Sequence, residues 1–158
     1  MDAGELEERF VLACFEDGGG QGFDYRAAGE RVGAAPAEAD ALARRLADRG
    51  LFQALSAAGE GVFTPQGRAL AGELLRGKAR DPRYWTDEQR TFLRAAFERS
   101  RGGNPPFDCA ATAAAAGLPR QSADRIRANL IQRGLLVDAR QMRTFTPAGL
   151  DAVRAHFA

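Results

Sequence analysis

The chain has 158 residues, a length that suits one ordinary domain or two small ones. Hydrophobic residues make up 45% of it and charged residues 27%, as in a soluble globular protein, and the formal net charge is only +1. No apolar run approaches the length of a membrane span, and the acidic opening "MDAGELEERF" lacks the apolar core of a secretory signal. We therefore expect a cytoplasmic protein with no membrane partner.

Few residues of this chain suit catalysis or metal binding. Cys14 and Cys109 are far apart and match no metal or redox spacing, so we expect free thiols buried in a core. His156 is the only histidine, which excludes a histidine cluster. Because no acid, base and nucleophile converge, we expect neither an enzyme nor a cofactor or metal. The single lysine, Lys78, among 22 basic residues indicates GC-rich coding and a bacterial source.

The first predicted element in chain order is an amphipathic helix over 5–15. Its apolar positions follow the spacing of one helix face and are Leu6, Phe10, Ala13 and Cys14. A glycine-rich loop and a short extended piece ending at Phe23 follow. The next residue, Asp24, is placed to cap a second, short helix.

A turn and a third helix come next. Gly33 marks the turn, where the chain needs a positive φ, and Pro36 lies at the first turn of the third helix, where a missing N–H is tolerated. Leu42 and Leu46 form the inner face of that helix, and Gly50 ends it as a C′ glycine.

A β-hairpin and a last helix complete this half. The stretch "LFQAL" predicts a strand, and a return strand ends at Phe63. In the following "FTPQG", Thr64 is predicted to cap the last helix and Pro65 to occupy its first turn. The motif therefore marks a junction between a strand and a helix.

The same series of features returns 82 to 84 positions later. A capping box, "TDEQ" at 86–89, opens the second copy. The counterparts of the caps, turn glycines and prolines named above are Asp108, Gly117, Pro119, Gly134, Thr146 and Pro147. Insertions fall only in loops, which is typical of a duplicated domain.

The order helix, short strand, helix, turn, helix, hairpin, helix resembles the winged helix-turn-helix family over nearly the whole chain. In each copy a small residue, Gly29 or Ala113, stands four positions before the turn glycine, and "RGLF" or "RGLL" and then "FTPxG" follow. The resemblance implies a mainly α, α+β fold of two tandem winged-helix domains. Each would hold three to four helices and a small hairpin wing.

We place the acidic domain 1 at 1–75, a basic linker at 76–86 and the basic domain 2 at 87–158. The linker contains "RDPRYW", whose Tyr84 and Trp85 either stack on a nucleic-acid base or pin the linker against one domain. We favour pinning.

Charge is divided unevenly between the two copies. Residues 1–74 carry 13 acidic and 7 basic groups, a net charge of −6, whereas residues 87–158 carry 11 basic and 7 acidic groups, a net charge of +4. Residues 75–86 add a net charge of +3. Since a DNA-binding face needs local positive potential, only the linker and the second copy provide one.

In the resembling family the third helix enters the major groove. In the second copy we expect Arg125, Gln121 and Gln132 to meet base edges. Four arginines are expected to meet phosphates, two on this helix and two at the hairpin tip: Arg120, Arg127, Arg140 and Arg143. Ser122 matches the early Ser or Thr of many DNA-reading members, and Asn129 flanks the same face.

The corresponding face of the first copy carries Ala37, Asp40, Ala41, Arg44 and Asp48, a poor reader of DNA. The sequence therefore predicts a duplex-binding protein, either a transcriptional regulator or a nucleoid-associated accessory. The first copy would pair with itself in a homodimer or with a protein partner. The alternative is a protein–protein interaction scaffold, as tandem winged helices are in endosomal sorting complexes and in accessory subunits of bacterial condensins.

Overall fold

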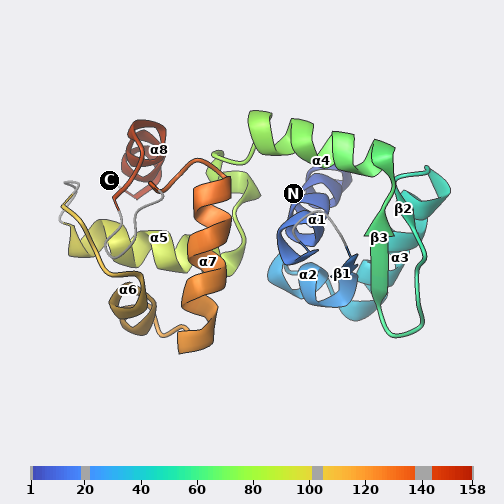
Figure 1. Ribbon diagram of the computed structural model, residues 1–158, viewed down its shortest axis with the longest axis horizontal. Helices are drawn as coiled ribbons and strands as arrows, with labels where there is room; N and C mark the ends of the chain where they lie inside the picture. Colours follow the sequence, from blue (N-terminus) through green and yellow to red (C-terminus); the bar gives the residue numbers. More distant parts are fainter. Residues whose placement is uncertain (1, 19–21, 101–104, 138–143, 158) are drawn as a thin grey trace. The chain divides into compact units, whose positions relative to one another are not determined.

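The computed structural model describes residues 2–18, 22–100, 105–137 and 144–157. These residues form eight α-helices, one short 3-10 helix and one antiparallel sheet of three strands, which confirms the mainly helical α+β class (Figure 1). The chain divides into two compact units, Met1–Lys78 and Ala79–Ala158, hereafter unit 1 and unit 2.

Unit 1 contains four helices and the sheet. Its elements in order are α1 (Ala3–Gly18), β1 (Gly22–Asp24), α2 (Tyr25–Arg31), α3 (Pro36–Asp48), β2 (Phe52–Gln53), β3 (Glu60–Phe63) and α4 (Pro65–Gly77). The strand order is β1-β3-β2, with Phe23 opposite Gly61 and Phe52 opposite Phe63. The expected strand over "LFQAL" is shorter than that stretch, because Ala54 adopts a positive φ of 55° directly after β2.

Aromatic rings fill the core of unit 1. The ring centroid of Phe23 lies 4.7 Å from that of Phe52 and 4.8 Å from that of Phe63. Phe10 of α1 approaches Phe52 at 6.2 Å. All four side chains are at most 4% exposed, so α1 and all three strands of the sheet share one apolar centre.

Unit 2 contains the other four helices. Its elements are η1 (Pro82–Tyr84), α5 (Asp87–Arg99), α6 (Cys109–Ala115), α7 (Arg120–Gln132) and α8 (Pro147–Phe157). Within its described residues the expected second hairpin is reduced to one bridge between Leu136 and Phe145, extended by a hydrogen bond from Val137 N to Thr144 O at 2.9 Å. The predicted hairpin tip falls on 138–143, outside the described residues.

The side chains predicted to cap helices make the expected hydrogen bonds in both units. The carboxylate of Asp24 accepts from the N–H groups of Arg26 and Ala27, and Asp108 does the same for α6. Thr86 and Gln89 form the reciprocal capping box of α5, at 3.0 and 3.2 Å. These bonds satisfy N–H groups that the first helical turn cannot pair itself.

The turns before α3 and α7 are built alike. Gly33 and Gly117 have φ values of 82° and 72°, as predicted. Gly29 O then accepts from Ala34 N at 2.8 Å, and Ala113 O accepts from Leu118 N at 2.9 Å. A Cβ atom on Gly29 would lie 2.7 Å from Ala39 Cβ, so α2 and α3 pack closely at this point.

The "FTPxG" motif joins two helix ends through one hydroxyl group. Thr64 Oγ1 accepts from Gly67 N at 3.0 Å, which confirms the predicted cap, and also donates to Gly50 O at 2.6 Å. Thr146 Oγ1 repeats both bonds in unit 2, with Gly149 N at 2.9 Å and Gly134 O at 2.5 Å. The last turn of the third helix is therefore tied to the first turn of the fourth.

The glycine of the motif has a role that its sequence context does not reveal. A Cβ atom on Gly67 would lie 2.0 Å from Leu51 O, and one on Gly149 would lie 2.1 Å from Leu135 O. No side chain fits such a space, so the motif requires glycine for close backbone approach rather than for an unusual φ.

Most of the predicted linker, from Ala79 onward, belongs to unit 2. Trp85 is fully buried in its apolar core, and Tyr84 is 5% exposed, which confirms that these rings pin the segment. Arg133 is only 2% exposed and donates from Nη1 to Ala79 O and Tyr84 O, both at 3.1 Å. This buried arginine fastens the start of unit 2 to the end of α7.

Candidate nucleic-acid interface

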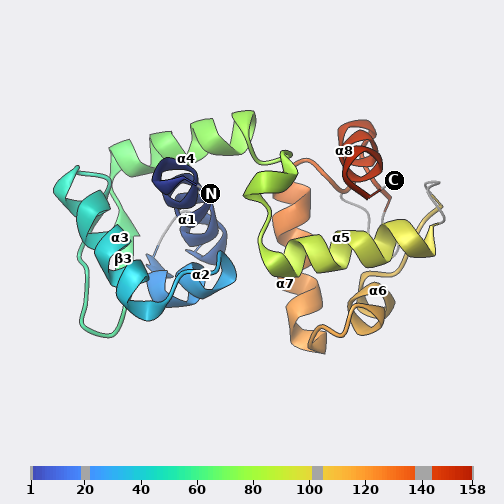
Figure 2. The same cartoon turned by 180° about the vertical axis from the view of Figure 1, so that it is seen from behind.

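The predicted reading helix is α7, which follows α6 after the turn at Gly117. Ala123, Ile126 and Leu130 face the core, as expected from their spacing. Helix α5 runs across α7 in both views of the molecule (Figures 1 and 2). The side chains of α7 that point away from the core therefore form the candidate surface of unit 2.

Three residues of the predicted DNA-binding set are exposed on α7. Arg120 and Gln121 lie in its first turn, and Gln132 lies at its last residue. Pro119, the N-cap, provides no side-chain hydrogen bond to this turn. Arg120 and Gln121 are both exposed and lie at the positive end of the helix dipole.

Two members of the predicted set are buried. Ser122 and Asn129 are each 7% exposed and lie on the side of α7 that packs against its own unit. A buried side chain cannot reach a base edge in a groove without leaving its packing, so neither residue belongs to the candidate surface. The helix buries a wider face than its three aliphatic positions indicate.

Two arginines of the predicted set lie beside carboxylates. Arg125 donates from Nη1 to Glu88 Oε2 at 2.8 Å and from Nη2 to Glu88 Oε1 at 3.1 Å, a bidentate pair between α7 and α5. Arg127 Nη1 lies 3.6 Å from Asp124 Oδ1, whose side chain is 86% exposed. The two arginines thus contribute less free positive charge than the sequence alone indicates.

The other two predicted contacts, Arg140 and Arg143, lie outside the described residues. Of the nine residues in the set, the structure brings Arg120 and Gln121 together at one exposed turn, with Gln132 at the far end of the same helix. Arg125 lies between them on the helix and is held by Glu88.

The equivalent face of unit 1 differs in its first turn. Glu38 Oε1 accepts from Ala35 N at 3.1 Å, so this carboxylate is used within the helix start. Asp40 forms an ion pair with Arg26 at 2.9 Å, and the hydrogen bond from that pair raises the pKa of the Arg26 guanidinium. Ala37 and Ala41 are exposed. The first turn of α3 therefore presents Ala37 and Glu38 where the first turn of α7 carries Arg120 and Gln121.

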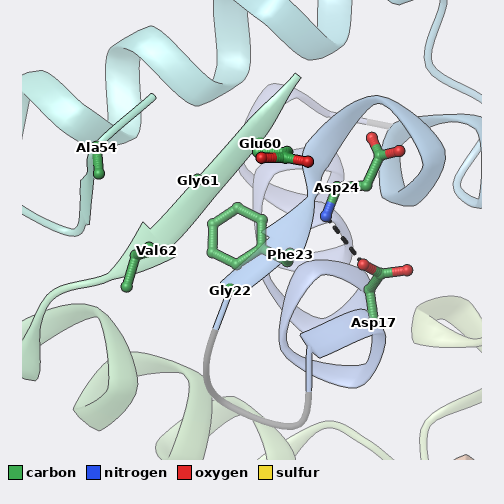
Figure 3. Close-up of a pocket in the computed structure, with 8 residues that line it drawn as sticks. All are labelled: Asp17, Gly22, Phe23, Asp24, Ala54, Glu60, Gly61 and Val62. Atoms are coloured by element: carbon green, nitrogen blue, oxygen red, sulfur yellow. Dashed lines mark hydrogen bonds between the residues drawn. The ribbon is translucent and has the colours of Figure 1, made fainter. Parts of the chain in front are cut away.

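Unit 1 also contains a pocket of about 420 Å³ at the edge of its sheet (Figure 3). Two of its carboxylates serve structural roles. Asp17 Oδ2 accepts from Asp24 N at 2.9 Å and Asp17 Oδ1 from Arg31 Nη1 at 3.0 Å, while Asp24 caps α2. The lining residues are Asp17, Gly22, Phe23, Asp24, Ala54, Glu60, Gly61 and Val62. Across the described ranges no group of three or more His, Cys, Asp or Glu side chains is arranged to hold a metal ion.

Cys14 and Cys109 are not joined in a disulfide, and both are buried, as predicted. Among the helices that the structure describes, none is long and apolar enough to cross a membrane. In comparisons with protein-family models, curated proteins and solved structures, no match to this chain was found, so its function has to be inferred from its own geometry and chemistry.

Proposed function

We propose that the chain consists of two tandem winged-helix domains and binds duplex DNA through unit 2, as a cytoplasmic transcriptional regulator or nucleoid-associated accessory. The helix and strand order of unit 1, with its sheet order β1-β3-β2, supports the winged-helix assignment. The matching caps, turn glycines and hydroxyl links of unit 2 extend that support to the second domain.

The observation that carries the proposal is the contrast between the first turns of α7 and α3. In α7 this turn presents exposed Arg120 and Gln121, whereas in α3 it presents Ala37 and a glutamate, Glu38, that caps its own helix. Arginine contacts phosphate or guanine, and glutamine can make a bidentate contact with adenine. The first turn of a reading helix is the part that meets base edges in helix-turn-helix proteins.

Charge supports the same assignment. The net charge of +4 on residues 87–158 attracts phosphate, whereas the net charge of −6 on residues 1–74 repels it. Because Arg125 and Arg127 lie beside carboxylates, the proposed contact is small, and we expect modest affinity that depends strongly on salt.

The test is a titration of a mixed-sequence duplex at two salt concentrations, with the full chain. The double variant Arg120→Ala, Gln121→Ala should weaken binding at least about tenfold and lower the slope of affinity against salt by about one, because one phosphate contact is lost. The matched control is Arg44→Ala, which removes the same charge from the exposed face of α3. It should leave binding unchanged within about twofold. If wild-type protein shows no duplex affinity at low salt, DNA binding is refuted.

A protein-interaction scaffold is the second candidate. It is favoured by unit 1, where Asp40 is already paired with Arg26 and the exposed α3 positions include Ala37 and Ala41. Recovery of one stoichiometric partner that survives nuclease treatment, together with no duplex affinity, would support this function over DNA binding.

A further inference from the structure

We propose that Glu88 competes with DNA for Arg125: its carboxylate takes the place of a phosphate and withholds this arginine from the duplex. The inference deepens the proposed function and rests on it. It assigns Glu88 as a residue that sets the strength and salt dependence of duplex binding by unit 2.

The geometry of the pair is that of a phosphate contact. Both terminal nitrogens of Arg125 donate to the two oxygens of Glu88, at 2.8 and 3.1 Å. The same parallel pair of N–H groups binds two oxygens of a phosphate. With the carboxylate in place this edge of the guanidinium is filled, and the pair as a whole is neutral. An approaching phosphate therefore gains little net attraction from Arg125.

Once its ion pair with Glu88 is broken, Arg125 is placed to contribute to duplex binding. It follows Gln121 by four positions on α7, so the two side chains neighbour each other along the helix surface. The side chains of Arg125 and Glu88 are 30% and 29% exposed, and both reach solvent. A freed Arg125 would extend the exposed turn formed by Arg120 and Gln121 by one helical turn.

The fold does not need this pair. In unit 1 the positions that correspond to Glu88 and Arg125 are Leu6 and Ala41, at the offsets of 82 and 84 that relate the two copies. Unit 1 nevertheless forms the corresponding helices, α1 and α3. Both charges are thus present in the unit with the cationic helix and absent from its counterpart, which points to a role on the α7 surface rather than in folding.

The experiment is a double-mutant cycle with a mixed-sequence duplex, comparing wild type, Glu88→Gln, Arg125→Ala and the double variant. We expect Glu88→Gln to tighten binding about threefold or more and to increase the salt slope by about one. Arg125→Ala should change affinity less than about twofold in the wild-type background but reverse the gain in the Glu88→Gln background. Circular dichroism spectra check that each variant is folded.

The control variant is Asp87→Asn, which removes a neighbouring carboxylate of α5 that is 76% exposed and pairs with Arg90 instead. It should alter affinity less than about twofold. An equal gain in Asp87→Asn and Glu88→Gln would overturn the inference, because the effect would then be one of net charge alone. Weaker binding by Glu88→Gln would also overturn it, since Glu88 would then position Arg125 for DNA.

A readout without DNA tests the pair itself. Phenylglyoxal modifies accessible arginines. In wild-type protein it should react more slowly with Arg125 than with Arg120. In Glu88→Gln it should react with Arg125 faster than it does in wild-type protein. An unchanged rate at Arg125 overturns the inference even when Arg120→Ala, Gln121→Ala shows that the proposed DNA contact is correct. If wild-type protein and all variants show no duplex affinity, the proposed function is refuted, and the role of Glu88 is refuted with it.

Discussion

Replacing Gly67 by alanine should destabilise unit 1, although alanine is the better helix former. The added Cβ atom would lie 2.0 Å from Leu51 O and 2.9 Å from its carbonyl carbon. A carbon–oxygen contact normally needs about 3.3 Å, so the two backbones must separate by more than about 1 Å. Leu51 O also accepts from Thr64 N at 3.1 Å, and this bond would be stretched by the same movement.

The expected net effect follows from three contributions. Forced separation of packed backbone costs about 1 to 3 kcal/mol, and a weakened hydrogen bond costs about 1 kcal/mol. The gain in helix propensity from glycine to alanine returns about 1 kcal/mol. Unfolding free energy should therefore fall by about 2 kcal/mol in Gly67→Ala, as measured by urea denaturation followed by circular dichroism.

Helix α4 contains a matched control. A Cβ atom on Gly72 would meet only the guanidinium of the exposed Arg76, at 3.5 Å. Gly72→Ala should therefore raise the unfolding free energy by about 0.5 to 1 kcal/mol. The reasoning is refuted if Gly67→Ala is as stable as wild type or if both variants change stability in the same direction.

Two further predictions concern buried groups. Arg133→Leu should lower the unfolding free energy by about 2 to 4 kcal/mol, because two charge-assisted hydrogen bonds to Ala79 O and Tyr84 O are lost. Arg49 is the counterpart of Arg133 in unit 1, and its side chain is 53% exposed. Arg49→Leu should therefore lower the unfolding free energy by less than about 1 kcal/mol in the same denaturation assay. Burial raises the pKa of the Cys14 thiol well above its ordinary value, and the nearby carboxylates add to this rise. The folded state thus holds its thiol proton after the unfolded chain has lost it, so this contribution to stability is intact below about pH 9 and is lost as the pH rises further. Wild-type protein should then lose unfolding free energy more steeply than Cys14→Ala above that pH, and parallel curves would contradict the assignment.

Local chemistry made much of the fold predictable. The caps at Asp24 and Asp108, the turn glycines and the threonine of "FTPxG" act on neighbours a few residues away, so the sequence alone identifies both partners. These caps and turns were therefore expected correctly. Two helix ends differ from the prediction: α1 extends beyond 5–15 at both ends, and Pro119 is the N-cap of α7 rather than part of its first turn. For the second hairpin, the described residues show the bridge from Leu136 to Phe145, and its predicted tip stays a prediction.

Contacts between distant segments were not predictable in this way. Arg125 and Glu88 are 37 positions apart, and no sequence pattern marks them as partners. Periodicity placed Asn129 at the edge of an exposed face, yet packing against its own unit buries it. Arg133 and Arg49 occupy equivalent positions in "RGL", and only the three-dimensional structure separates a buried arginine from an exposed one. In each case the burial or the ion pairing of the side chain is set by residues of other helices and strands that pack around it.

The hydroxyl link at Thr64 gives the hairpin of unit 1 a practical use. Because Gly50 and Gly67 are joined through this one side chain, the ends of α3 and α4 keep their spacing whatever lies at the tip between Ser56 and Gly59. Ala57 and Ala58 at that tip are exposed, so an epitope or a fluorescent label can be inserted there with little disturbance to the helices. Such a tagged chain would make the acidic unit visible in imaging while the cationic helix stays unmodified.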